Sequence, residues 1–437
     1  MRIAMVGAGY VGLVSGACFA DFGHEVVCVD KDAAKIAALR EGQAPFYEPG
    51  LSELVVANQR AGRLSFTTDI AEGMRGAQAV FIAVGTPTLP GDGAADMRYV
   101  FQAAREIGDA IDSFVVVVNK STSPIGTCDE VERLIGERAP KDRFVVVSNP
   151  EFLREGAAID DFKQPDRVVI GVEDEAARLV MREIYRPLER NGSPIVCTSR
   201  RTSELIKYAA NVYLAMKVTF INEIADLCEK VGGDVLDVAH GIGLDKRIGR
   251  KFLNPGPGFG GSCFPKDTLA LTKIATDARS PMRLVETLVD VNEKRKVAMA
   301  HKIIKACGGS VAGKTIAALG LTYKPNTDDM RDAPSLVIVP ILQAAGARIV
   351  AFDPEGAKSA EALLPGVEFA SGPYACLEGA DALVVITEWD AFRALDLARV
   401  KAALREPVVV DLRNIYSLDT MSALGFRYEG VGRGAGA

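Results

Sequence analysis

The sequence lacks the features by which several classes of protein are recognised. It has only three histidines, and none of its eight cysteines stands in a Cys-x-x-Cys pair, so no zinc site is expected. No apolar run approaches the roughly 20 residues of a transmembrane helix, and no long basic run accompanies the net charge of −6. These absences argue against metal, membrane and nucleic-acid binding, and the scattered cysteines indicate reduced thiols in a cytoplasmic protein.

A glycine turn follows the first predicted strand. Residues 2–6 form a short apolar run, and Gly7-Ala-Gly9-Tyr-Val-Gly12 comes directly after it, ahead of a helix predicted over residues 13–22. In this context Gly7 permits a tight turn and Gly9 lets the backbone approach a pyrophosphate. Gly12 then allows the helix to pack closely on the strand. The pattern predicts a dinucleotide-binding site.

The second predicted strand, residues 25–29, ends in Asp30. A carboxylate at this point accepts the adenosine ribose hydroxyls and repels a 2′-phosphate, so NAD is the predicted cofactor rather than NADP. Lys35 lies one helical turn further on. It is expected either beside the cofactor or as a solvated helix residue.

Polar residues follow three further predicted strands, at residues 79–84, 114–119 and 144–148. Ligands of open parallel sheets bind at the carboxyl ends of the strands, so these residues are expected to form one rim. The segments of the rim are Gly85-Thr86-Pro87, Lys120-Ser-Thr122-Ser123 and Asn149-Pro-Glu151-Phe-Leu-Arg-Glu155-Gly156.

A long helix is predicted over residues 202–231, because the segment lacks proline and glycine until Gly232 and Gly233 stop it. It would span on the order of 45 Å at about 1.5 Å per residue, which suits a spine between domains and a contact between two subunits. Lys207 and Asn211 share one face of it. They are either surface polar residues or part of a site.

A second α/β unit is predicted from strands at residues 315–321, 348–352, 382–386 and 408–412. The turn after its first strand lacks the glycine fingerprint, so this sheet is expected to bind another nucleotide or the substrate. The predicted fold is α/β, with two doubly wound Rossmann-like domains joined by a long central helix. The predicted domains are residues 1–200, 201–306 and 307–437, and residues 430–437 are expected to form a disordered tail.

Residues 252–267 form a loop around a cysteine. Every residue from Pro255 to Gly261 except Phe259 is glycine or proline, which excludes a regular helix or strand. Pro265 is typical of the first turn of a helix, and a cysteine just before a helix N-terminus and beside Lys266 favours the thiolate. Cys263 is therefore either an inert thiol in a glycine-rich turn or a nucleophile. An NAD site together with a nucleophilic thiol favours oxidation of an alcohol through an aldehyde to an acid.

These motifs together resemble the UDP-glucose 6-dehydrogenases within the nucleotide-sugar dehydrogenase family, over nearly the whole chain. The resemblance implies oxidation of the glucose C6 alcohol of UDP-glucose to the carboxylate with two NAD⁺, and a supply of UDP-glucuronate for polysaccharide biosynthesis. It also implies a homodimer. The matching motifs are the glycine turn, Tyr47-Glu-Pro-Gly-Leu51, Val84-Gly-Thr-Pro87, Lys120-Ser-Thr, residues 149–156, Lys207 with Asn211, residues 257–267 and Tyr323-Lys-Pro-Asn-Thr-Asp-Asp-Met-Arg331.

The resemblance assigns roles to individual residues. Cys263 is implied as the nucleophile that forms a thiohemiacetal and then a thioester, and Lys207 with Asn211 as the pair that stabilises the oxyanion. Glu155 and Asp267 are implied as the acid–base carboxylates, and the sequence leaves open which of them serves which step.

Further residues are implied as contacts. Thr122 resembles a water-holding hydroxyl next to the cofactor. The implied NAD contacts are Gly7, Gly9, Val11, Gly12, Asp30, Lys35, Gly85, Thr86, Thr122, Glu155, Lys266 and Arg331. The implied sugar-nucleotide contacts are Glu151, Phe152, Leu153, Arg154, Glu155, Lys207, Asn211, Phe252, Leu253, Asn254, Pro255, Gly256, Gly260 and Lys324.

Two other functions fit parts of the sequence. GDP-mannose 6-dehydrogenases share the run at residues 149–156, but usually carry a Tyr-Leu-Arg-Pro type of segment where residues 252–257 read Phe-Leu-Asn-Pro-Gly-Pro. UDP-galactose and UDP-N-acetyl sugars are weaker alternatives as substrates. A catalytically silent NAD-binding regulator would keep the glycine turn but would not need Cys263, Lys207, Asn211 and Asp267 together. Ser123 departs from the apolar or β-branched residue usual in the family, which affects local packing.

Overall fold

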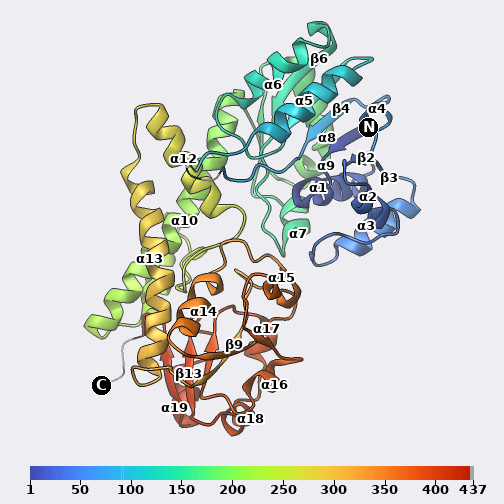
Figure 1. Ribbon diagram of the computed structural model, residues 1–437. Coiled ribbons are helices and arrows are strands. Elements are labelled where there is room, and N and C mark those ends of the chain that lie inside the picture. Colours follow the sequence, from blue (N-terminus) through green and yellow to red (C-terminus); the bar gives the residue numbers. More distant parts are fainter. Residues whose placement is uncertain (90, 92, 434–437) are drawn as a thin grey trace. The chain divides into compact units, whose positions relative to one another are not determined.

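The structure is a computed structural model that describes residues 1–89, 91 and 93–433 (Figure 1). It divides into two compact units. The first contains Met1–Ala210 with Lys273–Ala278, and the second contains the remainder of the chain. Within the described residues, no helix is long and apolar enough to cross a membrane. The three predicted domain ranges stay a prediction.

An eight-stranded sheet forms the centre of the first unit, in the order β3-β2-β1-β4-β5-β6-β7-β8. The strands from β3 to β6 are parallel, β7 meets β6 in antiparallel register at Ser148 and Gly171, and β8 is parallel to β7. The strands are β1 Arg2–Val6, β2 Glu25–Val29, β3 Leu64–Thr67, β4 Ala79–Ile82, β5 Val115–Asn119, β6 Phe144–Ser148, β7 Val168–Gly171 and β8 Ile195–Thr198.

Helices cover both faces of this sheet because its strands are apolar on both sides. Val116 and Val118 of β5 pack on one face, toward α1, α2, α3, α7, α8 and α9. Val115 and Val117 pack on the other, toward α4, α5 and α6. The helices are α1 Tyr10–Asp21, α2 Ala33–Arg40, α3 Leu51–Arg60, α4 Ile70–Met74, α5 Arg98–Ala110, α6 Thr127–Gly136, α7 Ala158–Lys163, α8 Glu175–Ile184 and α9 Arg186–Arg190, with a 3₁₀ turn at Lys141–Arg143.

The second unit contains a six-stranded parallel sheet in the order β11-β10-β9-β12-β13-β14. It repeats the topology of strands β1 to β6 of the first sheet, since in each sheet the strand that comes first in the sequence lies centrally and the strand order then reverses direction. The strands are β9 Thr315–Leu319, β10 Arg348–Phe352, β11 Glu368–Phe369, β12 Ala382–Val385, β13 Val408–Asp411 and β14 Arg427–Gly430.

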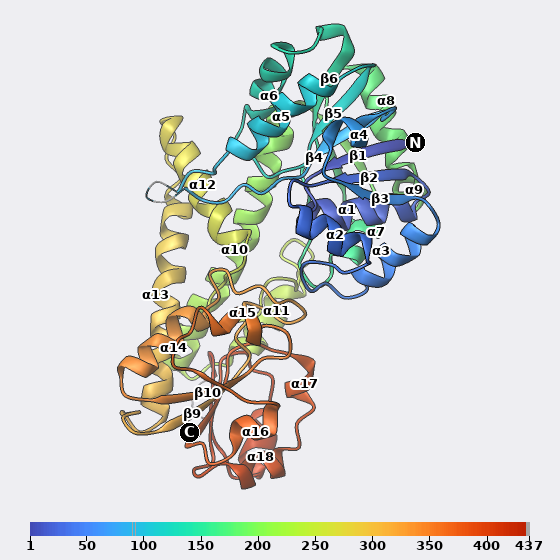
Figure 2. The same ribbon diagram turned by 45° about the vertical axis from the view of Figure 1, so that its right-hand side comes forward.

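Two helical layers enclose the second sheet (Figure 2). One layer includes α10, α13 and α14, and the other includes α16, α18 and α19. The long helix α10 starts in the first unit and continues into the second. The helices are α10 Arg200–Val231, α11 Val235–Gly243, α12 Phe264–Asp277, α13 Arg283–Ala306, α14 Ser335–Ala344, α15 Ala357–Glu361, α16 Pro373–Leu377, α17 Asp390–Arg393, α18 Leu397–Ala403 and α19 Leu418–Ala423.

The predicted fold class is confirmed, with two doubly wound sheets and a long helix. The expectation of a disordered tail from residue 430 is wrong at its start. Gly430 ends β14, the backbone N–H of Val235 donates to Gly432, and Arg433 pairs with Asp234 at 3.2 Å. Those contacts tie the strand end to the start of α11, and residues 434–437 lie outside the described residues.

Candidate active site

The glycine turn after β1 is shaped by close backbone approaches. Gly7 has φ +101, and a Cβ there would lie 2.5 Å from the carbonyl oxygen of Ala83. A Cβ at Gly12 would lie 1.9 Å from the carbonyl oxygen of Gly7, so only glycine lets α1 start this close to the strand. Gly9 is the N-cap of α1 and makes no side-chain cap hydrogen bond. A helix N-terminus without a capping side chain suits a phosphate, so the turn fits a dinucleotide.

Asp30 stands at the end of β2 and faces this turn. Its carboxylate accepts the backbone N–H of Ala8 at 2.9 Å and of Asp32 at 3.0 Å. Lys35 Nζ donates to it at 2.9 Å. Burial raises the pKa of Asp30, but these hydrogen bonds outweigh burial and hold its pKa below the ordinary value. Asp30 is therefore ionised near neutral pH, and Lys35 lies beside it rather than as an isolated solvated residue.

The loops that follow β4 and β5 are joined to each other. The hydroxyl of Thr86 donates to the carbonyl oxygen of Thr122 at 2.9 Å, and that of Ser121 donates to the carbonyl of Val84 at 2.8 Å. Ser123 Oγ accepts the side-chain amide of Asn119 at 2.8 Å, which gives the unusual serine a local partner. These contacts hold two segments of the predicted rim, the loops after β4 and β5, next to each other.

A buried lysine lies at the same edge of the sheet. Lys120 Nζ donates to Asn149 Oδ1 at 3.2 Å and to the Tyr185 hydroxyl at 3.3 Å, and the residue is only 3% exposed. Burial lowers the pKa of Lys120 to about 8, against the opposing attraction of Glu151. Asn149 in turn donates to the carbonyl of Val169 at 2.8 Å, so the lysine braces the loop after β6.

Lys207 and Glu151 form a buried ion pair in the first unit. Lys207 Nζ donates to Glu151 Oε1 at 2.9 Å, and both side chains are about 5% exposed or less. Glu151 Oε2 also accepts the backbone N–H of Leu153 at 2.6 Å. Burial raises the pKa of Glu151, but the charge of Lys207 and these hydrogen bonds outweigh it and leave the pKa below the ordinary value. The predicted strand-end loop and the predicted helix face therefore meet.

Glu48 is a residue of this region that sequence reasoning did not single out. Its carboxylate accepts the backbone N–H of Gly156 at 2.6 Å and of Ala158 at 2.7 Å, and it also accepts the hydroxyl of Tyr10. It thereby caps α7 and holds the loop of Glu155 against the helix that follows the glycine turn. The Tyr47-Glu-Pro-Gly-Leu51 motif was the available signal, but nothing local in it reveals a partner more than 100 residues away.

In the second unit, Cys263 precedes α12 directly. Its carbonyl oxygen accepts the backbone N–H of Asp267 at 2.8 Å, so Cys263 is the N-cap residue of this helix, and Pro265 stands in the first turn as predicted. Asp267 Oδ2 accepts the side-chain amide of Asn211 at 2.7 Å, and Oδ1 accepts Lys266 Nζ at 2.6 Å. A thiol, a buried acid, an amide and an amine are thus held together around the start of one helix.

The glycine-rich loop before Cys263 is held through its backbone. The N–H of Gly256 donates to Asn222 Oδ1 at 2.8 Å, and its carbonyl accepts Arg295 Nε at 2.7 Å. The Asn292 side chain accepts the N–H of Phe259 at 2.8 Å and donates to its carbonyl at 3.1 Å. Asn292 therefore pairs with Phe259 as one peptide group pairs with another in a sheet. Sequence reasoning missed all three helix residues.

Three further residues that were predicted to contact ligands, Arg331, Lys324 and Arg154, each have a neighbouring side chain as a partner. The backbone N–H of Gly261 donates to the carbonyl of Arg331 at 2.8 Å, while the Arg331 guanidinium pairs with Asp329 at 2.8 Å. Lys324 Nζ lies 5.2 Å from the ring centroid of Tyr323. Arg154 pairs with Asp161 at 2.6 Å.

Comparison with known proteins gives three consecutive family matches. Residues 1–189 match the NAD binding domain of the UDP-glucose/GDP-mannose dehydrogenase family, residues 201–294 match its central domain, and residues 317–418 match its UDP binding domain. The chain belongs to this family. The predicted resemblance and the predicted NAD cofactor are therefore confirmed.

Relatives within the family match over nearly their whole length. The UDP-glucose 6-dehydrogenase of Rhizobium meliloti is 62% identical over 99% of this chain and 100% of its own, and UDP-glucose 6-dehydrogenase TuaD of Bacillus subtilis is 48% identical over 99% and 94%. Among solved structures, a UDP-glucose dehydrogenase from Pyrobaculum islandicum matches with a TM-score of 0.90 at 39% identity, covering 99% of this chain and 98% of that one. The solved structure shares the fold described above.

Proposed function

We propose that this member of the family oxidises the C6 alcohol of UDP-glucose to the carboxylate of UDP-glucuronate. The observation that carries the proposal is the thiol of Cys263 at the N-terminus of α12, beside a buried acid that is bonded to Asn211 and Lys266. A simple alcohol dehydrogenase needs no such nucleophile, whereas oxidation to an acid does. Full-length relatives named UDP-glucose 6-dehydrogenase support the same substrate.

The first oxidation needs a hydride acceptor and a base. NAD⁺ would supply the hydride acceptor, with one NAD⁺ consumed in each of the two oxidations. We assign its contacts to the glycine turn, to Asp30 with Lys35, and to the loops of Gly85–Thr86 and Thr122. The proton of the C6 hydroxyl leaves to a carboxylate, for which Glu155 and Asp267 are the candidates. Glu155 lies in the loop held by Glu48, and Asp267 lies one turn after Cys263.

The second oxidation passes through the thiol. Cys263 Sγ adds to the aldehyde carbon, and its proton leaves to a base, so a thiohemiacetal forms with its oxygen stabilised by Lys207 and Asn211. Loss of the second hydride converts this group to a thioester. Water then adds to the thioester carbonyl, the C–S bond breaks, and the thiolate of Cys263 is regenerated with release of the carboxylate. The positive end of α12 favours the thiolate as attacking and leaving group.

The sugar nucleotide is proposed to contact three segments, namely residues 151–155, the loop at residues 252–260, and Lys324. The loop at residues 252–260 offers backbone groups at a fixed position because Asn222, Asn292 and Arg295 hold it. Residues 317–418, which match the UDP binding domain of the family, support the assignment of Lys324 to the nucleotide.

A second copy of this chain is the proposed partner. The exposed face of α10 carries Tyr213, Phe220 and Leu227, which are about half exposed and recur every seven residues. Such a stripe on a long helix suits pairing with the same helix of another copy. Phe220→Glu is expected to give monomers, measured by analytical ultracentrifugation.

The proposed location is the cytoplasm, because a reducing compartment keeps a reactive thiol free. The proposed role of the product is the supply of UDP-glucuronate for polysaccharides.

The test is a panel of nucleotide sugars with NAD⁺ and NADP⁺, read as absorbance of the reduced cofactor. UDP-glucose is expected to give two NADH per sugar, and Cys263→Ser is expected to form no UDP-glucuronate. One NADH per sugar, or near-normal UDP-glucuronate from the variant, contradicts the thioester route. Preferential turnover of GDP-mannose or of a UDP-N-acetyl sugar contradicts the substrate while leaving the chemistry in place.

A further inference from the structure

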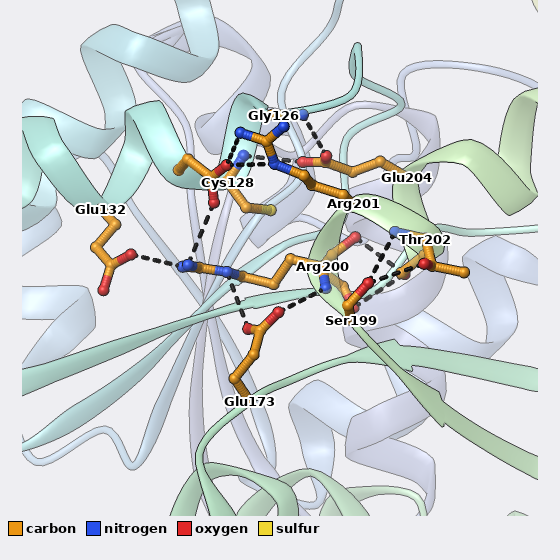
Figure 3. A network of polar contacts seen from close by, with 12 residues as sticks. Gly126, Cys128, Glu132, Glu173, Ser199, Arg200, Arg201, Thr202 and Glu204 are labelled. Carbon is orange, nitrogen blue, oxygen red and sulfur yellow. Dashed lines mark hydrogen bonds and ion pairs between the residues drawn. The ribbon is translucent and has the colours of Figure 1, made fainter.

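A buried carboxylate near the start of α10 binds the backbone of another helix. Glu204 is 3% exposed. Its Oε2 accepts the backbone N–H of Gly126 at 2.6 Å, and its Oε1 accepts the N–H of Cys128 at 2.8 Å (Figure 3). Both oxygens are thus engaged by the N-terminus of α6, and each oxygen has its own donor.

Helix α6 depends on this contact because it has no capping side chain of its own. Its N-cap is Gly126, whose φ of 93° favours glycine. The first N–H groups of a helix lack partners within the helix, and a negative charge there is stabilising. Glu204 supplies the missing acceptor and the charge from 78 residues further along the chain.

The loop held in this way is the one between β5 and α6. It contains Lys120 and Thr122. It is tied to the β4 loop by the hydroxyl of Thr86, which donates to the carbonyl of Thr122, and by the hydroxyl of Ser121, which donates to the carbonyl of Val84. Glu204 therefore provides the anchor at the α6 end of a segment whose β4 side is already fixed. The carbonyl of Thr122 is itself one of the contacts on the β4 side, and the Glu204 anchor follows it in the chain at Gly126.

The same stretch of α10 makes two further contacts with the sheet of the first unit. Ser203 Oγ lies 3.0 Å from Ser148 Oγ at the end of β6, and Lys207 pairs with Glu151 beyond that strand. A Cβ on Gly171 would lie 2.6 Å from Ser203 Cβ, so the start of α10 packs closely against the end of β7. The first turns of this helix thus contact the loop after β5 through Glu204 and the loop after β6 through Lys207.

We infer that Glu204 is a positioning residue for the reaction. It fixes the loop that contains Thr122, and it fixes the rotation of α10 about its axis, which determines where Lys207 lies. The roles of Thr122 and Lys207 rest on the proposed function, whereas the contacts of Glu204 do not. The effect on the cofactor is expected to exceed the effect on the sugar nucleotide, since the anchored loop follows a strand of the NAD-binding domain.

The surroundings of Glu204 provide a matched control. Arg200 pairs with Glu132 at 2.8 Å and with Glu173 at 3.0 Å, and Figure 3 shows these pairs beside the Glu204 contact. The Glu132 side chain is about half exposed, and ion pairs of this kind contribute little. Glu132 lies on α6 itself, and Glu132→Gln removes one carboxylate charge from the same region while it leaves both hydrogen bonds of Glu204 to the start of α6 in place.

The test compares Glu204→Gln, Glu132→Gln and the unchanged protein. An amide can accept only one of the two N–H groups and turns its own NH₂ toward the other. Calorimetry without turnover is expected to show NAD⁺ binding weakened roughly tenfold in Glu204→Gln and unchanged in Glu132→Gln. With UDP-glucose, kcat is expected to fall while the KM for the sugar nucleotide stays within about twofold.

A purely structural role gives a different result. Glu204→Gln would then melt at a lower temperature, but well below that temperature it would bind NAD⁺ and turn over as the unchanged protein does, and this outcome overturns the inference. If the glutamine variant does not fold, Glu204→Asp carries the same expectation, because its carboxylate is one methylene too short to reach both N–H groups. Because NAD⁺ binding is measured without substrate, the wrong sugar nucleotide does not obscure the result.

Discussion

The two parallel sheets of this molecule share a topology but differ in the turn that follows the first strand. Gly7 and Gly320 both have positive φ, and each donates its N–H to the last residue of the neighbouring strand, Val29 or Phe352. Beyond that point the turns diverge. Thr322 stands where the first sheet has Gly9, and Pro325 stands where it has Gly12.

The consequence is a difference in where the first helix begins. After β1, α1 starts at Tyr10 and presents an N-terminus without a capping side chain. After β9, the chain runs on as a loop, and α14 does not start until Ser335. The second sheet therefore has no helix N-terminus at the position that corresponds to the glycine turn of the first, as the missing fingerprint predicts.

The acid after the second strand shows the same divergence. Asp30 accepts two backbone N–H groups and the amine of Lys35, whereas Asp353 is 2% exposed and accepts from the backbones of Leu321, Thr322, Glu355 and Gly356. Asp353 also accepts the hydroxyl of Thr322 at 3.2 Å. The same position thus carries a carboxylate that faces the glycine turn in one sheet and a carboxylate that holds the loop backbone in the other.

The largest effect is expected from the glycines that distinguish the turns. Gly12→Val places side-chain atoms against the carbonyl of Gly7, where even a Cβ lies at 1.9 Å, so NAD⁺ binding is expected to weaken by at least about 100-fold. Pro325→Ala, at the corresponding position of the second sheet, is expected to leave NAD⁺ affinity unchanged. Calorimetry with NAD⁺ decides both, and loss of affinity in the proline variant would mean that the second sheet binds the dinucleotide.

A pair of Asp→Asn variants separates binding from stability. Asp353→Asn turns an NH₂ toward backbone N–H groups in either orientation, and is expected to lower the free energy of unfolding of its unit by about 3 kcal/mol without changing NAD⁺ affinity. Asp30→Asn is expected to weaken NAD⁺ binding about tenfold with a smaller loss of stability, because Asp30 is partly exposed. Denaturant unfolding and calorimetry measure the two effects, and an exchange of the two phenotypes would contradict the comparison.

Strands β5 and β13 occupy corresponding positions in the two sheets. A buried lysine, Lys120, follows β5, and a buried aspartate, Asp411, ends β13. Lys120 has its pKa lowered by burial to about 8, below the ordinary 10.5. Between these values the unfolded chain binds more protons, so stability rises with pH across this window. Relative to Lys120→Met, the unchanged protein is expected to gain about 3 kcal/mol between pH 8 and 10.5, measured by denaturant unfolding at each pH. Parallel pH profiles would show that Lys120 is charged as easily in the fold as in water.

Asp411 ends β13 and gives the smallest and opposite effect. Burial raises its pKa above the ordinary 3.8, although the backbone N–H groups of Arg413 and Tyr416 oppose burial. The folded state then binds more protons above pH 3.8, so this carboxyl destabilises the fold as the pH rises through its folded pKa. Asp411→Asn is expected to flatten the decline of unfolding free energy in that acidic window. An unchanged slope would indicate that another carboxyl causes the decline.

Much of the architecture was predictable because it depends on short-range sequence patterns. The apolar strands, the glycine turn at Gly7 and the helix start at Pro265 can each be recognised from a few consecutive residues. The short edge strands β3, β8, β11 and β14 were not predicted, since two to four residues carry too little periodicity. The start of the disordered tail at Gly430 was misjudged because the glycine-rich composition outweighed a strand, β14, that only its neighbour β13 defines.

The predicted site residues were recognisable by type and motif, but the residues that hold them were not. Glu48 acts on Gly156, Glu204 on Gly126 and Asn292 on Phe259, across separations of 108, 78 and 33 residues. When a carboxylate caps a helix that is distant in sequence, the sequence of that helix shows only that a capping side chain is missing. Gly126 at the start of α6 is such a position, and its partner on α10 can be identified only from the fold.

The hydrogen bonds from Asn222, Asn292 and Arg295 to the backbone of the loop before Cys263 have an evolutionary consequence. Because these side chains bind peptide groups, they hold the loop in place whatever side chains it carries, except where backbone geometry demands glycine, as at Gly258 with φ +108. Asn254 and its neighbours can therefore mutate without loss of the loop's position. Under the proposed function, in which this loop contacts the sugar nucleotide, a change of sugar preference becomes accessible through single substitutions in the loop, while the scaffold on α10 and α13 stays unchanged.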